Sequence, residues 1–183
     1  MLRLIDNPIA RYPEGSSLEE GLGIWAVAHV KPRQEKALAR DLASAAIPYY
    51  LPMVEKRTRR RDNGKVRKSV MPLFPSYLAV ALERERWDRA YRTDRVAGIL
   101  PVEDQRGFVR ELAQVQRTID SSVRVSLAPT FTAGQLVRVK RGPLMGLLSE
   151  VAQAKGQTIF VIWVRMFQQA IRVELDELDL EPV

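Results

Sequence analysis

Few residues of this chain could perform acid–base, nucleophilic or metal chemistry. The sequence has no cysteine, and its only histidine is His29. Without a thiolate or a second imidazole, most zinc sites and most nucleophile–base pairs are excluded. His29 alternates with Ala28 and Val30 in an apolar run, which indicates a structural histidine. Gly142–Gly146 lacks the lysine and hydroxyl residue of a phosphate-binding loop. We therefore expect a protein that is not an enzyme and needs no metal or cofactor.

The chemistry that the sequence does offer is positive charge. The net charge is +7, and residues 23–120 hold the excess, with 20 basic and 12 acidic residues. The run Lys56–Lys68 alone contains eight basic residues and one acidic residue. Asn63-Gly64 within it is a strong hairpin-turn signal. The pattern predicts a basic hairpin tip that attracts a polyanion such as DNA. A solvated surface hairpin is the alternative interpretation.

A second candidate site lies in the stretch Met71–Leu82. From Tyr77 onward this stretch is almost continuously apolar, as in a strand covered on both faces. Pro72 and Pro75 cannot donate a hydrogen bond within a sheet, so they predict a kinked entry at a sheet edge. We expect this entry to hold Phe74 and Tyr77 near the surface.

The elements that must position these residues alternate between strand and helix over the first two-thirds of the chain. Their order, β-α-β-β-α-β-α, favours an α+β fold of the split β-α-β type, an antiparallel sheet with helices on one face. Trp25, in the first strand, is expected in the core. Strands are predicted over Ile24–Val30, Tyr49–Val54, Met71–Leu82 and Gly98–Val102, and helices over Lys31–Ala46, Glu83–Thr93 and from Phe108 to Ile119.

Composition divides the chain into four parts. Residues 1–22 mix proline, glycine, serine and acids without periodicity and predict a flexible leader. Residues 23–120 are expected to form the first domain, and the polar stretch 121–131 predicts a linker. Residues 132–183 contain short β-rich runs and glycine–proline punctuation, which predict a small antiparallel barrel.

The second domain also contains a helical signal. Leu147–Ala154 is rich in helix formers, whereas Thr158–Val164 is dense in β-branched residues. The turn-forming residues Gly142, Pro143 and Gly146 favour the barrel. A helical hairpin is the alternative interpretation. The helical stripe consists of Phe167, Ala170, Ile171, Leu175 and Leu178.

Two sets of motifs resemble the NusG family of transcription elongation and antitermination factors. In the first domain they are Trp25, the Lys31–Ala46 helix and Leu73-Phe74-Pro75-Ser76-Tyr77, where the family usually has Phe-Pro-Gly/Asn-Tyr. In the second domain, Gly134–Gly146 resembles the KOW motif and Val173–Leu175 its closing strand. The resemblance implies an NGN-like domain followed by a five-stranded SH3-like barrel.

Three departures from the housekeeping pattern resemble a specialised paralogue of the RfaH kind. Leu144 stands where KOW motifs usually have phenylalanine, and Ser149 where they have a third glycine. Residues 100–104 replace a loop rich in glycine and proline. In proteins of the RfaH kind the second domain switches between a helical hairpin that masks the polymerase site and a free barrel.

The resemblance implies a transcription elongation or antitermination factor that binds RNA polymerase, contacts DNA near the transcription bubble, and recruits a ribosome or termination factor. Such a factor would be a cytoplasmic monomer without a membrane segment. A ribosome-associated, RNA-binding KOW protein is the alternative. The implied sites are Phe74, Pro75 and Tyr77 for polymerase, Leu144 and Met145 for the KOW partner, and, for nucleic acid, Lys31, Arg33, Lys36, Arg57, Arg59, Arg60, Arg61, Lys65, Arg67, Lys68 and Arg95.

Overall fold

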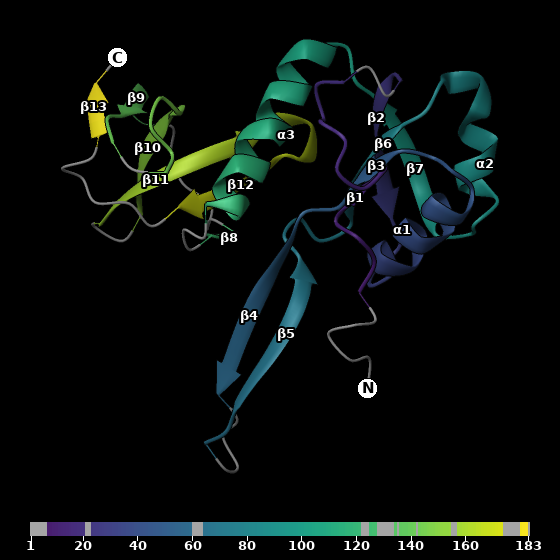
Figure 1. The fold of residues 1–183 in the computed structure, drawn as a ribbon, viewed down its shortest axis with the longest axis horizontal. Coiled ribbons are helices and arrows are strands. Elements are labelled where there is room, and N and C mark those ends of the chain that lie inside the picture. Colours follow the sequence, from purple (N-terminus) through teal and green to yellow (C-terminus); the bar gives the residue numbers. More distant parts are fainter. Residues whose placement is uncertain are drawn as a thin grey trace. The chain divides into compact units, whose positions relative to one another are not determined.

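The computed structural model describes residues 7–20, 23–59, 64–121, 125–127, 134, 136–141, 143–154, 157–173 and 180–182. The chain divides into two compact units, Met1–Glu103 and Asp104–Val183. Figure 1 shows their strands and helices. Both helices and antiparallel sheets are present, so the fold class is α+β as the sequence predicts.

The first unit is built on a five-stranded antiparallel sheet in the order β1-β3-β6-β2-β7. The strand β2 (Trp25–Val30) lies between β6 and β7 and pairs antiparallel with both. This arrangement agrees with the split β-α-β prediction. The other sheet strands are β1 (Arg11–Tyr12), β3 (Tyr49–Tyr50), β6 (Tyr77–Ala81) and β7 (Val96–Pro101).

Two helices, α1 (Glu35–Ser44) and α2 (Trp87–Tyr91), pack into one core with alternate residues of the sheet strands. Leu38 and Leu42 of α1, four residues apart, are both buried on its inner face. Ala26 and Ala28 of β2 belong to the same core, so both helices cover the same face of the sheet (Figure 1). Trp25 is 3% exposed, which agrees with its predicted core position.

The segment before β2 differs from the predicted flexible leader. Within the described residues 7–20, strand β1 pairs with β3, and Leu18 is buried. The hydroxyl of Tyr49 donates to the carbonyl of Ile9 at 2.9 Å, and the rings of Tyr12 and Tyr49 stack at 6.3 Å. Polar composition suggested disorder, but a few apolar side chains dock this segment on the sheet edge.

Prolines divide two strands that the sequence predicted as continuous. The predicted strand Tyr49–Val54 becomes β3 and β4 (Met53–Arg59), with Pro52 between them. The predicted strand Met71–Leu82 becomes β5 (Val66–Pro72) and β6, separated by Leu73–Ser76. The strands β4 and β5 pair only with each other, as a two-stranded sheet that extends from the first unit (Figure 1). We call Met53–Arg59 with Val66–Pro72 the ribbon.

The second unit contains a six-stranded antiparallel sheet in the order β13-β9-β10-β11-β12-β8. Its edge strands β13 and β8 do not pair with each other in the described part of the chain, so the predicted closed five-stranded barrel is not confirmed. The strand β8 lies inside the predicted linker. The strands are β8 (Val125–Leu127), β9 (Leu136–Val139), β10 (Leu148–Ala154), β11 (Gln157–Val164), β12 (Gln169–Val173) and β13 (Leu180–Pro182).

In the second unit, the structure has strands where the sequence left a helical alternative open. Leu148–Ala154, rich in helix formers, is β10, and Ala170 and Ile171 of the predicted helical stripe lie in β12. Leu175 and Leu178 lie outside the described residues. Cross-strand pairing with β11, whose β-branched residues favour strand, overrides the local helix preference of β10.

The helix α3 (Gln105–Asp120) belongs to the second unit by its contacts. Asp104 caps it, because its carboxylate accepts from the N–H of Gly107 at 2.8 Å. Phe108 meets Phe167 edge-to-face with ring centroids 5.8 Å apart, and α3 packs against β11. The sequence assigned this helix to the first domain, and that boundary at residue 120 stays a prediction.

Candidate polymerase and nucleic-acid interface

The ribbon, with Lys65 just before β5, holds four of the eight described cationic side chains that the sequence assigned to nucleic acid. Its register pairs Arg57 with Lys68 and Thr58 with Arg67. Arg57, Lys65, Arg67 and Lys68 are all exposed. Arg60 and Arg61 lie outside the described residues, and of Arg59 only the backbone is described. The structure therefore confirms two antiparallel strands with exposed basic side chains, and the predicted turn at Asn63 lies outside the described residues.

One acid interrupts this positive charge. Glu55 pairs with Arg57, whose Nε lies 2.7 Å from its Oε1, and with Lys68, whose Nζ lies 3.6 Å from the same oxygen. The hydrogen bond from Arg57, with help from the charge of Lys68, lowers the pKa of the Glu55 carboxyl. Glu55 is therefore ionised at neutral pH and offsets part of the charge of its two neighbours.

The second predicted cluster of cations, around the start of α1, is mostly engaged within the protein. Lys31 pairs with Asp94 at 2.6 Å, and Arg95 pairs with Asp41 at 2.6 Å and donates to the side chain of Gln34. These contacts hold the loop before α1 against the loop before β7. Both cations remain near the surface, but each already has an anionic neighbour.

Lys36 and Arg33 complete that cluster and differ from each other. The Lys36 ammonium donates to the carbonyl of Val70 in β5 and to Asn7, and burial lowers its pKa. Lys36 thus anchors the base of the ribbon to α1. Arg33 is exposed, has a positive φ of 63°, and forms no ion pair with the residues that the structure describes.

The proline-framed turn places its two aromatic residues differently. Phe74 is only 1% exposed, so it does not lie near the surface as the sequence predicted. Tyr77 is half-buried and stacks on His29 with ring centroids 5.4 Å apart, and Pro75 is exposed. His29 is itself exposed, so the accessible members of this site are Pro75, Tyr77 and His29.

A buried acid that the sequence analysis missed fixes this turn. Glu35, only 6% exposed, accepts from the backbone N–H of Ser76 at 2.8 Å. Ser76 has a φ of 67°, and its carbonyl accepts from the N–H of Val30 at 2.8 Å. The turn is thereby tied to both α1 and β2. An acid in the first turn of a helix gives no sequence signal that distinguishes this role from ordinary helix capping.

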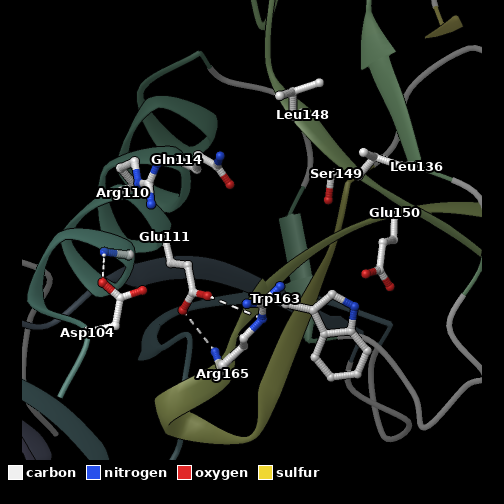
Figure 2. Close-up of a pocket in the computed structure, with 11 residues that line it drawn as sticks. Asp104, Arg110, Glu111, Gln114, Leu136, Leu148, Ser149, Glu150, Trp163 and Arg165 are labelled. Carbon is white, nitrogen blue, oxygen red and sulfur yellow. Dashed lines mark hydrogen bonds and ion pairs between the residues drawn. The ribbon is translucent and has the colours of Figure 1, made fainter. Parts of the chain in front are cut away.

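The second unit has a pocket of about 340 Å³ between α3 and β9–β11 (Figure 2). Glu111 of α3 accepts from the backbone N–H of Arg165 at 3.0 Å, and its carboxylate lies 3.7 Å from the Arg165 Nε. Burial raises the pKa of Glu111 despite this partner. Leu136 and Leu148 expose apolar surface at the other wall. The residues that line the pocket are distant in sequence, so no local sequence motif predicts it.

The two residues predicted to contact the KOW partner also differ. Leu144 is fully buried, and Met145 is 63% exposed. Both lie in the turn before β10, where the N–H of Gly146 donates to the carbonyl of Val139 at 2.8 Å. Leu144 therefore anchors the turn, and Met145 is the member available to a partner.

The described part of the chain contains no group of three or more histidine, cysteine, aspartate or glutamate residues that could hold a metal ion. None of its helices is both long enough and apolar enough to cross a membrane.

Comparison with known proteins gives a matching family and similar solved structures. No curated protein matches the chain. A solved structure titled "Domain interaction in Thermotoga maritima NusG" is 16% identical, with a TM-score of 0.45, and the match covers 87% of this chain and 97% of that one. The family described as "NusG: Transcription termination factor nusG" matches residues 23–121, more than half of the sequence. The chain therefore belongs to the NusG family of transcription factors.

Proposed function

We propose that this protein is a transcription elongation or antitermination factor that binds RNA polymerase through its first unit. The observation that carries this proposal is the family match over residues 23–121, which includes the whole turn from Phe74 to Tyr77. The protein acts by binding, without catalysis, in the cytoplasm where the polymerase works.

The polymerase surface is built around Pro75, Tyr77 and His29. Tyr77 and His29 form a stacked aromatic pair on the neighbouring inner strands β6 and β2, and Pro75 stands exposed beside them. Rigid aromatic side chains make effective anchors for a partner helix because little conformational freedom is lost on binding. Phe74 supports this surface from beneath, since it is buried in the same turn.

The second unit recruits a further factor, such as a ribosome or termination factor, through the turn that ends β9. Met145 exposes 63% of its surface there, and Leu136 and Leu148 are also exposed on neighbouring strands. Exposed apolar side chains gathered on one small unit favour a protein partner. The proposal includes that this protein is a specialised paralogue of the RfaH kind and not a housekeeping factor.

Co-purification with RNA polymerase tests the proposal. The variant Pro75→Glu, Tyr77→Ala should lose affinity about 30-fold or more, because hot-spot residues contribute about 2 kcal/mol or more each. The control Pro143→Glu places the same charge on an exposed proline of the second unit and should bind polymerase like wild type. Recovery of ribosomes without polymerase would favour the ribosomal alternative, and wild-type polymerase binding by the folded double variant would contradict the proposed surface.

A further inference from the structure

The two faces of the ribbon differ in how their cations are engaged, a difference that its sequence alone does not show. We propose that the ribbon binds duplex DNA through one of them, the face that carries Lys56, Thr58 and Arg67. The choice of DNA as the polyanion rests on the proposed function, whereas the choice of face rests on the ribbon's geometry.

The register of the ribbon assigns its residues to faces. Directly paired residues of an antiparallel ladder share a face, and successive residues alternate. Lys56 pairs with Ser69, and Thr58 pairs with Arg67. These four residues therefore share one face, called here the Lys56 face. The opposite face, called the Glu55 face, carries Glu55, Arg57, Arg59, Val66, Lys68 and Val70, and of Arg59 only the backbone is described.

The two faces differ in how their cations are engaged. On the Glu55 face, both Arg57 and Lys68 share the carboxylate of Glu55. On the Lys56 face, neither the Lys56 ammonium nor the Arg67 guanidinium makes an ion pair or a hydrogen bond with the residues that the structure describes, and the Ser69 hydroxyl donates only to the backbone carbonyl of Lys56. A phosphate approaching the Glu55 face must compete with a resident carboxylate, whereas the Lys56 face offers two cations and no acid.

The Lys56 face is also shaped for contact with a phosphate backbone. Lys56, Thr58 and Arg67 are exposed. Lys56 and Arg67 are diagonal neighbours across the ladder, a separation of roughly 7 Å, so both can reach one stretch of backbone. The Thr58 hydroxyl lies directly opposite Arg67 and can donate to the same phosphates.

The ribbon's composition and dimensions select duplex DNA among nucleic acids. Residues 53–72 contain no aromatic side chain, so the stacking that drives binding of single strands is missing. The major groove of B-form DNA is about 12 Å wide and admits a two-stranded ribbon. The deep and narrow major groove of A-form RNA does not. Seven residues in each strand give a reach of about 20 Å.

Two variants with equal loss of charge test the choice of face. Lys56→Gln, Arg67→Gln changes the proposed face, and Arg57→Gln, Lys68→Gln is its control on the opposite face of the same ribbon. Binding of each full-length protein to a fluorescent 20-base-pair DNA duplex would be titrated by anisotropy over a series of salt concentrations. Circular dichroism and thermal melting would establish that both variants fold like wild type.

We expect the Lys56 face variant to reduce the slope of log K against log salt by about 1.8, since each lost phosphate contact contributes about 0.9. The control should change the slope by less than about half as much, because Glu55 already neutralises part of its charge. Equal losses in both variants, or a larger loss in the control, would overturn the assignment of the face.

Further experiments distinguish a failure of the proposed DNA site from a failure of the proposed function. Single-stranded DNA and duplex RNA of the same length should bind more weakly than duplex DNA, and equal binding would overturn the choice of ligand. Both variants should still co-purify with RNA polymerase, because neither changes Pro75 or Tyr77. Failure of wild-type protein to bind polymerase would contradict the proposed function and leave the measured difference between the faces intact.

Discussion

The five-stranded sheet and the ribbon of the first unit use the same antiparallel pairing but differ in burial. In β6, Leu78, Ala79 and Val80 are completely buried. In the ribbon, Val66 is 60% exposed and Met71 is 43% exposed. Apolar burial stabilises the sheet, whereas cross-strand hydrogen bonds and side-chain pairs hold the ribbon, with its base anchored by Lys36.

This difference in burial determines where the protein can carry cations that bind a partner. A cation on the buried faces of β2 or β6 would lose its hydration without a partner. A cation on the ribbon keeps its water until a partner displaces it. The two regions meet at the turn Leu73–Ser76, where a strand of the ribbon ends and a strand of the sheet begins.

The largest expected effect is the difference in stability loss between a valine-to-alanine substitution in the sheet and the same substitution in the ribbon. Val80→Ala in the sheet should destabilise the protein by about 2–3 kcal/mol, because it removes two buried methyl groups and leaves a cavity. Val66→Ala in the ribbon should change stability by less than about 0.5 kcal/mol, because this side chain is mostly exposed. Chemical denaturation of both variants would measure the difference. Similar losses at the two positions would show that the ribbon is packed against something that covers Val66.

A smaller effect concerns Tyr49, which docks the N-terminal segment on the sheet. Burial raises the pKa of Tyr49 from 10.0 to about 12, and its hydroxyl donates to the carbonyl of Ile9. Tyr49→Phe should cost about 1 kcal/mol at neutral pH, the net value of a typical hydrogen bond.

The pH dependence of this effect follows from the direction of the pKa shift. The folded state holds the phenolic proton more tightly than the unfolded chain. The stabilisation is therefore complete below pH 10 and is lost as the pH rises towards 12, with a slope of up to about 1.4 kcal/mol per pH unit. The difference in unfolding free energy between wild type and Tyr49→Phe should shrink over this range and change sign at about pH 11. A difference that stays constant between pH 9 and pH 11 would contradict the raised pKa.

The elements of the first unit could be predicted because their signals are local. The apolar run of β2 and the spacing of Leu38 and Leu42 in α1 each specify one element without reference to the rest of the chain. The hairpin followed from Asn63-Gly64 and its flanking charges. These signals also located the basic candidate site.

Features that depend on contacts between distant residues could not be predicted in this way. Docking of residues 7–20 depends on Tyr49, far along the chain, and the pairing of β8 with β12 depends on residues 169–173. The engagement of Lys31, Lys36 and Arg95 by distant partners is equally invisible in a local pattern. The burial of Phe74 shows the same limit, because a proline-framed aromatic residue can face either way.

The smallest expected effect concerns the junction between the two regions, where Ser76 has a φ of 67°. A residue with a Cβ atom is strained by about 1–2 kcal/mol in this left-handed conformation, and glycine is not. Glycine also gives the unfolded chain more freedom, which offsets part of the gain. The two backbone bonds of Ser76, to Glu35 and Val30, are unaffected by loss of the side chain. Ser76→Gly should therefore stabilise the protein by up to about 1 kcal/mol.

The matched control for this substitution is Ser44→Gly, an exposed position in the last turn of α1. Glycine has a lower helix propensity than serine, so this control should lose about 0.5 kcal/mol, the opposite sign. Thermal or denaturant unfolding would measure both. A loss of stability in Ser76→Gly would mean that the serine side chain contributes to the junction more than its backbone strain costs. A gain at Ser76 with a loss at Ser44 would show that the left-handed turn, and not the side chain, defines how the ribbon joins the sheet.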